Sequence, residues 1–121
     1  MSYVDGFVIA VPKKNIPAYI KIAKKAGKVW LEHGALEYRE CVGDDLKVPA
    51  GLPFPKLVKP KRGEVVIFSW IVYKSRAQRD KVNAQVMKDP RITSMCEEPM
   101  PFDMKRMTYG GFKTIVSLRH G

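Results

Sequence analysis

The sequence has few of the residues from which disulfides, metal sites and membrane spans are built. Its 121 residues include two cysteines and two histidines. No CxxC, HxH or HExxH spacing occurs, so we expect neither a metal site nor a cofactor. Cys41 and Cys96 lie far apart in the chain, and we expect two reduced thiols in a cytoplasmic protein.

Long apolar runs are also lacking. No run is long enough to span a bilayer, which predicts no membrane partner. The first residues, Met1 to Gly6, lack a basic region followed by an apolar one, so we expect no signal peptide.

Positive charge is what the sequence has in excess. It carries 22 lysines and arginines against 12 acidic residues, for a net charge of +10. This charge is large for a chain whose length predicts one domain. Two interpretations remain open: binding of a polyanion such as RNA, or solubility alone.

One stretch, residues 64–73, organises the rest of the chain. Its β-branched and aromatic residues predict a strand rather than a helix. A strand with one face in water alternates apolar and polar residues, and this one does not. The two faces are Val66, Phe68, Trp70 and Val72 on one side, and Val65, Ile67, Ser69, Ile71 and Tyr73 on the other. Both faces therefore need cover.

Around this stretch the pattern predicts alternating strands and helices. We expect one domain over residues 1–116 and a flexible tail over 117–121, while the role of the proline-rich residues 46–63 stays open. Asn15 and Ser75 are candidate helix N-caps. The predicted elements are a strand (3–11), a helix (15–33), a strand (35–42), a short edge strand hairpinned to the central strand (54–59), the central strand (64–73), a helix (76–87), a helical turn (91–98) and a last strand (104–116).

This order predicts an α+β fold. It is the ferredoxin-like βαββαβ arrangement, with an antiparallel sheet and two helices on one face. The helices cover one face of the central strand, and the simplest cover for the other is a second copy of the sheet. We therefore predict a homodimer that forms a dimeric α/β barrel through the sheet face.

Several short blocks of the sequence are distinctive. They are Tyr3-Val4-Asp5-Gly6-Phe7, His33-Gly34-Ala35-Leu36, Phe68-Ser69-Trp70, Arg79-Asp80 with Asn83, Asp89-Pro90-Arg91, Met100-Pro101-Phe102-Asp103, Lys105-Arg106-Met107 and Tyr109-Gly110-Gly111-Phe112. With these blocks, over nearly its whole length, the chain resembles the YbaA-like family of bacterial proteins. That family is a domain of unknown function in the dimeric α/β barrel superfamily. The resemblance implies a ferredoxin-like fold and a homodimer, and it brings no activity.

The first functional hypothesis is a small organic molecule bound in a cavity between the sheet and the helices. The candidate ligand-binding residues are His33, Trp70, Asn83, Asp103, Arg106 and Tyr109. Each also has a structural interpretation: His33 as a helix cap, Arg106 in an ion-pair network with Asp103 or an acid of the partner, and Trp70 as part of the core.

Two alternatives remain. The first is RNA binding by a basic helix face and by the hairpin at 56–62, through Lys21, Lys24, Lys25, Lys28, Lys61 and Arg62. The aromatic pattern of RNA-recognition sheets is missing from residues 66–73. The second alternative comes from the resemblance, because members of the superfamily carry out cofactor-free oxygen chemistry. It implies a monooxygenase-like or isomerase-like enzyme using His33, Trp70 and Asn83. No motif specifies a reaction, so catalytic residues are left unassigned.

Overall fold

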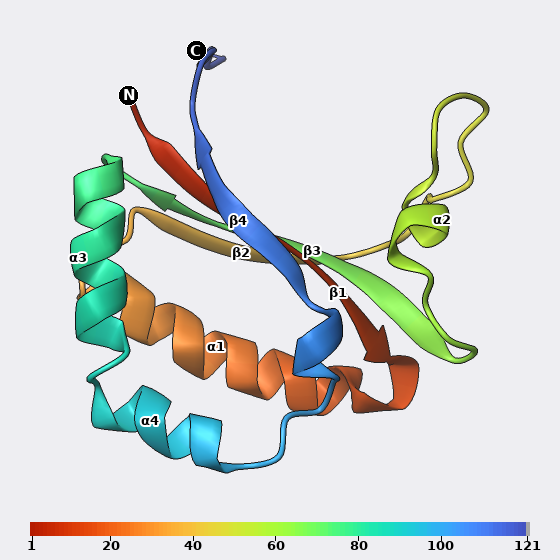
Figure 1. Ribbon diagram of the computed structural model, residues 1–121, viewed down its shortest axis with the longest axis horizontal. Coiled ribbons are helices and arrows are strands. Elements are labelled where there is room, and N and C mark those ends of the chain that lie inside the picture. The colour runs from red at the N-terminus through yellow and green to blue at the C-terminus, as the bar shows by residue number, and fades with distance from the viewer. Residues whose placement is uncertain (121) are drawn as a thin grey trace.

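The computed structural model describes residues 1–120. It forms two layers, a sheet above and helices below (Figure 1). The elements in chain order are β1 (Tyr3–Pro12), a 3₁₀ turn (Lys13–Asn15), α1 (Ile16–Glu32), β2 (Glu37–Val42), α2 (Phe54–Val58), β3 (Glu64–Tyr73), α3 (Arg76–Val86), α4 (Pro90–Glu97), a second 3₁₀ turn (Met104–Arg106) and β4 (Thr108–Lys113).

The sheet has four strands in the order β2-β3-β1-β4. Each neighbouring pair is antiparallel, with Phe68 of β3 opposite Val8 of β1 and Cys41 of β2. This topology, with α1 and α3 on one face, is the ferredoxin-like α+β fold. The predicted fold class is confirmed.

The core lies between the sheet and the helices. The odd-numbered residues of β3 point into it, and Ile67, Ile71 and Tyr73 are 3%, 3% and 0% exposed. From the helices, the residues that bury against this face are Tyr19, Ala23, Ala26 and Val29 of α1, Val82 and Val86 of α3, and Ile92 of α4. The buried side of α1 is therefore its apolar side, away from its exposed lysines.

The helix caps agree in part with the sequence. Ser75 caps α3, because its Oγ accepts a hydrogen bond from the Gln78 amide at 3.1 Å. Asn15 occupies the N-cap position of α1, but its side chain instead donates to the Pro101 carbonyl at 2.9 Å. Asn15 thus ties the start of α1 to the loop before β4.

The predicted edge strand at residues 54–59 is wrong, because this segment is the short helix α2. Pro55 lies in the first turn of α2, where proline's fixed φ favours a helix. In addition, β3 is already paired with β1 and β2, so no free edge remains for a hairpin partner. The hairpin predicted to carry Lys61 and Arg62 is therefore not formed.

The last strand is shorter than predicted. Residues 104–106 form a 3₁₀ turn, and β4 ends at Lys113 opposite Tyr3, where β1 begins and pairing stops. At Gly111 a Cβ would lie 2.5 Å from the Tyr3 hydroxyl, so the Tyr3 side chain can lie against β4 only because residue 111 has no side chain. Residues 114–120 have no regular structure. The flexibility of the tail stays a prediction, and Gly121 lies outside the described residues.

Candidate functional site

The structure places His33 at the end of α1, as the C-cap. Its Nε2 lies 2.9 Å from Oδ2 of Asp89, the residue that caps α4. Hydrogen bonds from Arg91 and from His33 lower the pKa of Asp89. His33 therefore joins the ends of two helices, as its structural interpretation suggests.

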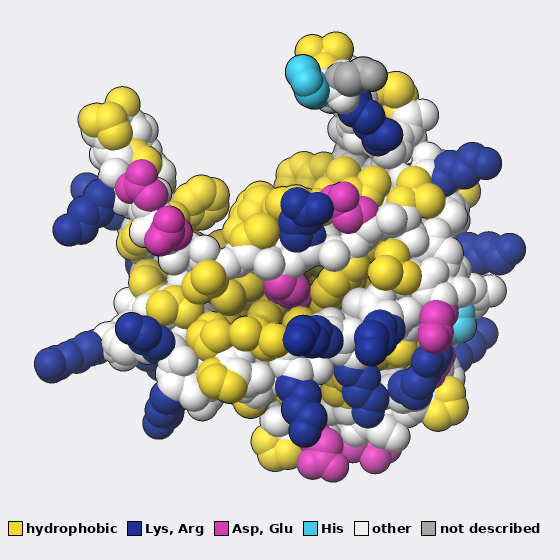
Figure 2. Space-filling view, turned by 180° about the vertical axis from the view of Figure 1, so that it is seen from behind, with side chains coloured by type: hydrophobic (Ala, Val, Ile, Leu, Met, Phe, Trp, Pro, Cys, Tyr) yellow, Lys and Arg dark blue, Asp and Glu magenta, His cyan; other side chains and the backbone are white. Residues whose placement is uncertain are grey.

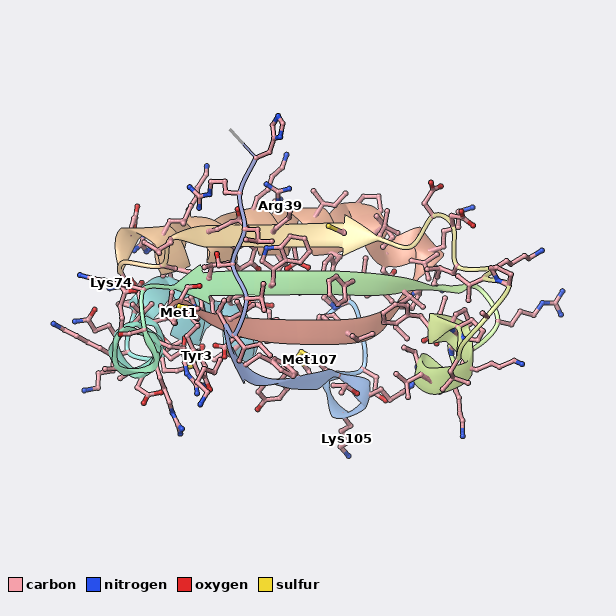
Figure 3. All side chains as sticks on the ribbon, turned by 90° about the horizontal axis from the view of Figure 1, so that it is seen from above. Met1, Tyr3, Arg39, Lys74, Lys105 and Met107 are labelled. Atoms are coloured by element: carbon pink, nitrogen blue, oxygen red, sulfur yellow. The ribbon has the colours of Figure 1, made fainter. Side chains whose placement is uncertain are left out.

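Trp70 lies on the opposite side of the sheet from the helices. Its Nε1 donates to Oε2 of Glu37 on β2, and the Arg39 guanidinium lies 5.7 Å from its ring centroid. Both neighbours come from β2, whose Arg39 is labelled in the view onto this face (Figure 3).

Asn83 faces the core from α3. Its Oδ1 accepts from Trp30 Nε1 at 3.1 Å and from the Tyr73 hydroxyl at 3.0 Å, and its Nδ2 donates to Asp5 at 3.4 Å. Asp5 is 5% exposed and also pairs with Arg79 at 3.4 Å. Burial and the Asp5 charge raise the pKa of Tyr73. We call these residues the buried polar network; it links α1, α3, β1 and β3.

Arg106 forms a two-pronged ion pair with Glu64, at the start of β3. Its two terminal nitrogens each donate to one Glu64 oxygen at 2.8 Å. Hydrogen bonding from Arg106 lowers the pKa of Glu64 to about 2. Asp103, one of the two kinds of acid considered as a partner for Arg106, caps the 3₁₀ turn by accepting from the Lys105 amide at 3.0 Å.

Tyr109 is 67% exposed, and its ring stacks on Phe7 at a centroid distance of 5.8 Å. The candidate ligand-binding residues therefore do not share one pocket. His33 lies at the helix ends, Trp70 on the sheet face away from the helices and Asn83 in the core, so these residues do not converge as the enzymatic alternative requires. Ligand binding by each residue stays a prediction.

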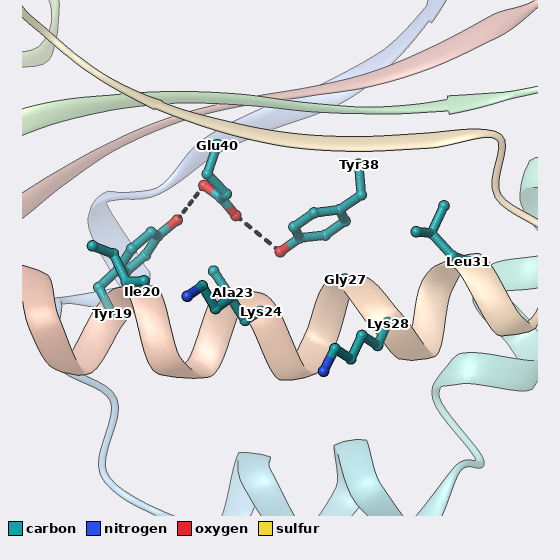
Figure 4. A pocket seen from close by; sticks show the side chains of 9 residues that line it. All are labelled: Tyr19, Ile20, Ala23, Lys24, Gly27, Lys28, Leu31, Tyr38 and Glu40. Atoms are coloured by element: carbon teal, nitrogen blue, oxygen red, sulfur yellow. Dashed lines mark hydrogen bonds between the residues drawn. The ribbon is translucent and has the colours of Figure 1, made fainter.

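A cleft between α1 and β2 brings together residues that the sequence analysis did not select. It encloses about 400 Å³, and Tyr19, Ala23, Tyr38 and Glu40 lie at its centre. Figure 4 shows the two tyrosine rings on either side, Ala23 of α1 below and Glu40 of β2 above. The remaining lining residues are Ile20, Lys24, Gly27, Lys28 and Leu31.

Glu40 is held by both tyrosines of this α1–β2 cleft. The Tyr19 hydroxyl donates to Oε1 at 2.7 Å and the Tyr38 hydroxyl to Oε2 at 2.9 Å (Figure 4). Burial and the Glu40 charge raise the pKa of both tyrosines, so both hydroxyls keep their protons at neutral pH. The arrangement is a fixed carboxylate between two hydrogen-bond donors.

Gly27 makes this geometry possible. A Cβ at this position would lie 2.8 Å from Cδ1 of Tyr38, closer than side chains approach. The ring can therefore lie on the helix only because residue 27 has no side chain. The sequence did contain a signal for this site, since Tyr38 and Glu40 are alternate residues on one face of a strand.

The cleft opens to the surface on the side of the molecule shown in Figure 2. Hydrophobic side chains gather there in a hollow across the middle of the face, and basic side chains lie along one side of it. Lys24 and Lys28 belong to that rim and are exposed. Within residues 1–120, every salt bridge uses an arginine or His33, and none uses a lysine.

The second hollow is on the sheet face that the helices leave bare. We call this surface the open face. It carries a groove of about 570 Å³ with mostly apolar walls. Phe68 is 44% exposed and Phe112 is 63% exposed. Two of the candidate ligand-binding residues, Trp70 and Tyr109, line this groove. Its other apolar side chains are those of Val4, Phe7, Val8 and Val72.

The basic residues proposed for RNA binding are exposed. Lys21, Lys24, Lys25 and Lys28 lie along α1, while Lys61 and Arg62 lie in the turn before β3. Among the described residues, no cluster of three or more His, Cys, Asp or Glu side chains is arranged to hold a metal ion. No helix in that part of the chain is long and apolar enough to cross a bilayer.

A family model described as a protein of unknown function, DUF1428, matches residues 2–104. The chain belongs to this family. YbaA of Escherichia coli K12, described as an uncharacterized protein, is 46% identical over 116 residues, which cover 96% of this chain and 98% of YbaA. YbaA of Shigella flexneri aligns to the same extent. The resemblance to the YbaA-like family is confirmed.

Solved structures share the fold at low sequence identity. Rv0793 from Mycobacterium tuberculosis is 11% identical with a TM-score of 0.61, covering 98% of this chain and 100% of that one. A nipsnap family protein from Agrobacterium tumefaciens is 15% identical with a TM-score of 0.56, covering 93% and 87%. A dimeric ferredoxin-like protein from an uncultured marine organism is 13% identical with a TM-score of 0.53, covering 99% and 100%. At such identities the likeness shows the ferredoxin-like fold alone.

Proposed function

We propose that this DUF1428 protein is a cytoplasmic homodimer that binds a small organic molecule in the α1–β2 cleft of each protomer. The main support for ligand binding is the size and the lining of this cleft. Its volume of about 400 Å³ falls in the range of roughly 300–1,000 Å³ typical of small-molecule sites. Its walls are apolar and aromatic, with one fixed carboxylate among them, which is the composition expected of such a site.

The lining defines the chemistry of the ligand. Tyr19 and Tyr38 both line the cleft, and aromatic walls favour stacked or edge contacts with a ring system in the ligand. Glu40 keeps lone pairs beyond the two that its tyrosines occupy, so it can accept a further hydrogen bond. Lys24 and Lys28 at the rim attract negative charge. The proposed ligand is a compact ring compound with a hydrogen-bond donor and an acidic group.

The open face supports the homodimer. An exposed apolar groove of this kind marks an interaction surface, and a second copy offers a matching surface by two-fold symmetry. The related fold from the marine organism is described as dimeric, which supports the same assembly here. Cys41 and Cys96 form no disulfide in the described chain, and reduced thiols are typical of the cytoplasm.

The ligand site is tested by thermal shift against a set of aromatic and alicyclic hydroxy acids. We expect at least one compound to raise the melting temperature of the wild type in a concentration-dependent way. Ala23→Phe narrows the cleft and should abolish the shift. Because Ala23 is 9% exposed and also packs in the core, the circular dichroism and the ligand-free melt of this variant are compared with those of the wild type. Ala84→Phe adds the same ring at an exposed position of α3 and should leave the shift unchanged.

A further pair of changes, Lys24→Ala with Lys28→Ala, separates the acidic group from the ring. The double variant should bind the acids more weakly than the wild type does, and it should bind the matching amides or esters as tightly as the wild type does. The ligand proposal fails if no compound shifts the wild type, or if Ala23→Phe responds as the wild type does.

RNA binding is a second candidate, favoured by one observation: the α1 lysines Lys21, Lys24, Lys25 and Lys28 are exposed and take part in no salt bridge within the described residues. Filter binding of a single-stranded RNA across a salt series tests it. RNA binding through these lysines predicts retention that falls steeply with salt and is lost when Lys21 and Lys25 become alanine. If the protein retains no RNA on the filter even at low salt, RNA binding is excluded.

A further inference from the structure

The chain after β4 forms an arm that stands clear of its own protomer. The hydrogen bonds that hold this C-terminal arm, residues 114–120, to the protomer are at its root: the Thr114 amide donates to the Ser2 carbonyl at 3.2 Å, and the two side-chain hydroxyls lie 2.9 Å apart. Beyond Thr114 the arm rises above the open face and runs from the β4 side toward the β2 side of the sheet (Figures 1 and 3).

The arm is apolar where a free tail would be polar. Ile115, Val116 and Leu118 are 81%, 72% and 92% exposed, while the nearby open face is apolar as well. Burying one such side chain is worth about 1.5–3 kcal/mol. These side chains gain little of that energy in an isolated protomer, and a partner that buried them would be stabilised by it.

A second projection stands at the other end of the sheet. This α2 lobe, residues 46–58, presents Leu52 and Leu57, which are 66% and 65% exposed. Phe54 of α2 makes an edge contact with Phe68 of the open face, with ring centroids 6.0 Å apart. Figure 2 shows the two projections at opposite ends, each with hydrophobic side chains. The α2 lobe therefore extends the apolar surface of the open face, and the arm is a second apolar projection at the other end of the sheet.

The reach of the arm fits a second copy. Sheets that pack face to face lie about 10 Å apart, and an extended chain advances about 3.3 Å per residue. About three residues after Thr114, Ile115 to Ser117, cross that gap between the two sheets, which leaves Leu118 to His120 to lie along the partner. None of the residues that line the groove of the open face is charged, in a molecule of net charge +10, so two copies meet there with less repulsion than at its basic surfaces.

We infer that the C-terminal arm of each protomer crosses to the other protomer and buries Ile115, Val116 and Leu118 against it. This inference rests on the homodimer proposed above and adds the segment that holds it together. The open faces supply the centre of the interface, and the two arms, related by the two-fold axis, clasp it from both sides.

Removing the arm tests the inference. A chain that ends at Thr114 should keep its circular dichroism, and its dimer dissociation constant, measured by sedimentation equilibrium, should rise at least tenfold. The double change Ile115→Ser with Leu118→Ser should act in the same direction without shortening the chain. Ser117→Ala, on the same arm, should leave the dissociation constant within a factor of two.

A second measurement distinguishes binding to the partner from folding back on the same protomer. In the monomeric Phe68→Asp background, truncation after Thr114 should not change the urea midpoint. A lowered midpoint there, or a truncated protein that dimerises as tightly as the wild type, overturns the arm inference. A wild type that is monomeric at every concentration overturns the proposed homodimer instead.

Discussion

The two faces of β3 carry the same kinds of residue, but one face is buried and the other is partly exposed to solvent. On the helix side, Ile71 and Tyr73 are 3% and 0% exposed, and the polar groups of Tyr73 and Asn83 are paired. On the open face, Phe68 is 44% exposed and Trp70 finds its partners only in its own sheet.

The two faces differ because helices pack against only one of them, and not because their residues differ in polarity. The helices α1, α3 and α4 all pack against one face of the sheet. Of the described helices, these are the ones with eight residues or more, so no long helix is left to cover the other face. The other face keeps residues suited to burial and receives only the α2 lobe at one end. One face therefore stabilises the protomer, and the other is free to join protomers. Substitutions on the two faces should have different consequences.

Val82→Asp should have the largest effect. Val82 is 1% exposed in the helix-side core, and a carboxylate there has no partner. We expect the free energy of unfolding to fall by more than about 4 kcal/mol, most of the stability of a small domain. Circular dichroism should show loss of the cooperative melt. Ala84→Asp, on the exposed side of the same helix, should melt as the wild type does.

Phe68→Asp should break the assembly and spare the protomer. The side chain is already 44% exposed, so the new carboxylate stays hydrated in the monomer and is buried only in the dimer. Sedimentation should show monomers at micromolar concentration with unchanged circular dichroism. An unfolded variant, or one that remains dimeric, would mean that the two faces do not differ in this way.

Asn83→Ala should weaken the helix side without abolishing it. The change leaves the Trp30 indole, the Tyr73 hydroxyl and Asp5 short of a partner. Each buried polar group left unpaired costs about 1–3 kcal/mol, so we expect a loss of about 3 kcal/mol in urea unfolding. Gln85→Ala, at an exposed neighbouring position, is the control. A loss as small as that of the control would show that the buried polar network is not stabilising.

The smallest effect concerns the Arg106–Glu64 pair at the end of β3. Because hydrogen bonding from Arg106 lowers the pKa of Glu64 from 4.5 to about 2, its contribution is present above pH 4.5 and is lost as the pH falls toward 2. Arg106→Gln should therefore lower the urea midpoint at pH 7 and leave it unchanged near pH 2. Lys105→Gln should have no effect at either pH. If the urea midpoint of Arg106→Gln is still below that of the wild type near pH 2, Arg106 stabilises the protein by something other than its pair with Glu64.

The sequence predicted the architecture well because the spacing of apolar and charged residues along the chain indicates which segments are strands and which are helices. The two apolar faces of residues 64–73 and the lysine face of α1 are local patterns, and each appears in the structure as expected. The α2 helix was missed because the free edges of β3 depend on strand pairing, which is not local. The end of the last strand was misplaced for the same reason, since it is set by where β1 begins.

The candidate site was harder to predict. Tyr19 and Glu40 are 21 residues apart, and their contact depends on how α1 packs against β2. Asp5 did give a signal, because it is a charged residue at a helix-facing position of β1, where Phe7 and Ile9 are apolar. Its partners Arg79 and Asn83 lie more than 70 residues later in the chain, and no spacing reveals them.

The association state of the wild type tests the difference between the two faces most directly. Sedimentation equilibrium from high nanomolar to tens of micromolar concentration should give a mass twice that of the chain, falling to one chain on dilution. Phe68→Asp should give one chain throughout. A folded wild type that sediments as a single chain across the whole range would show that the open face is stable in water, and would contradict the account.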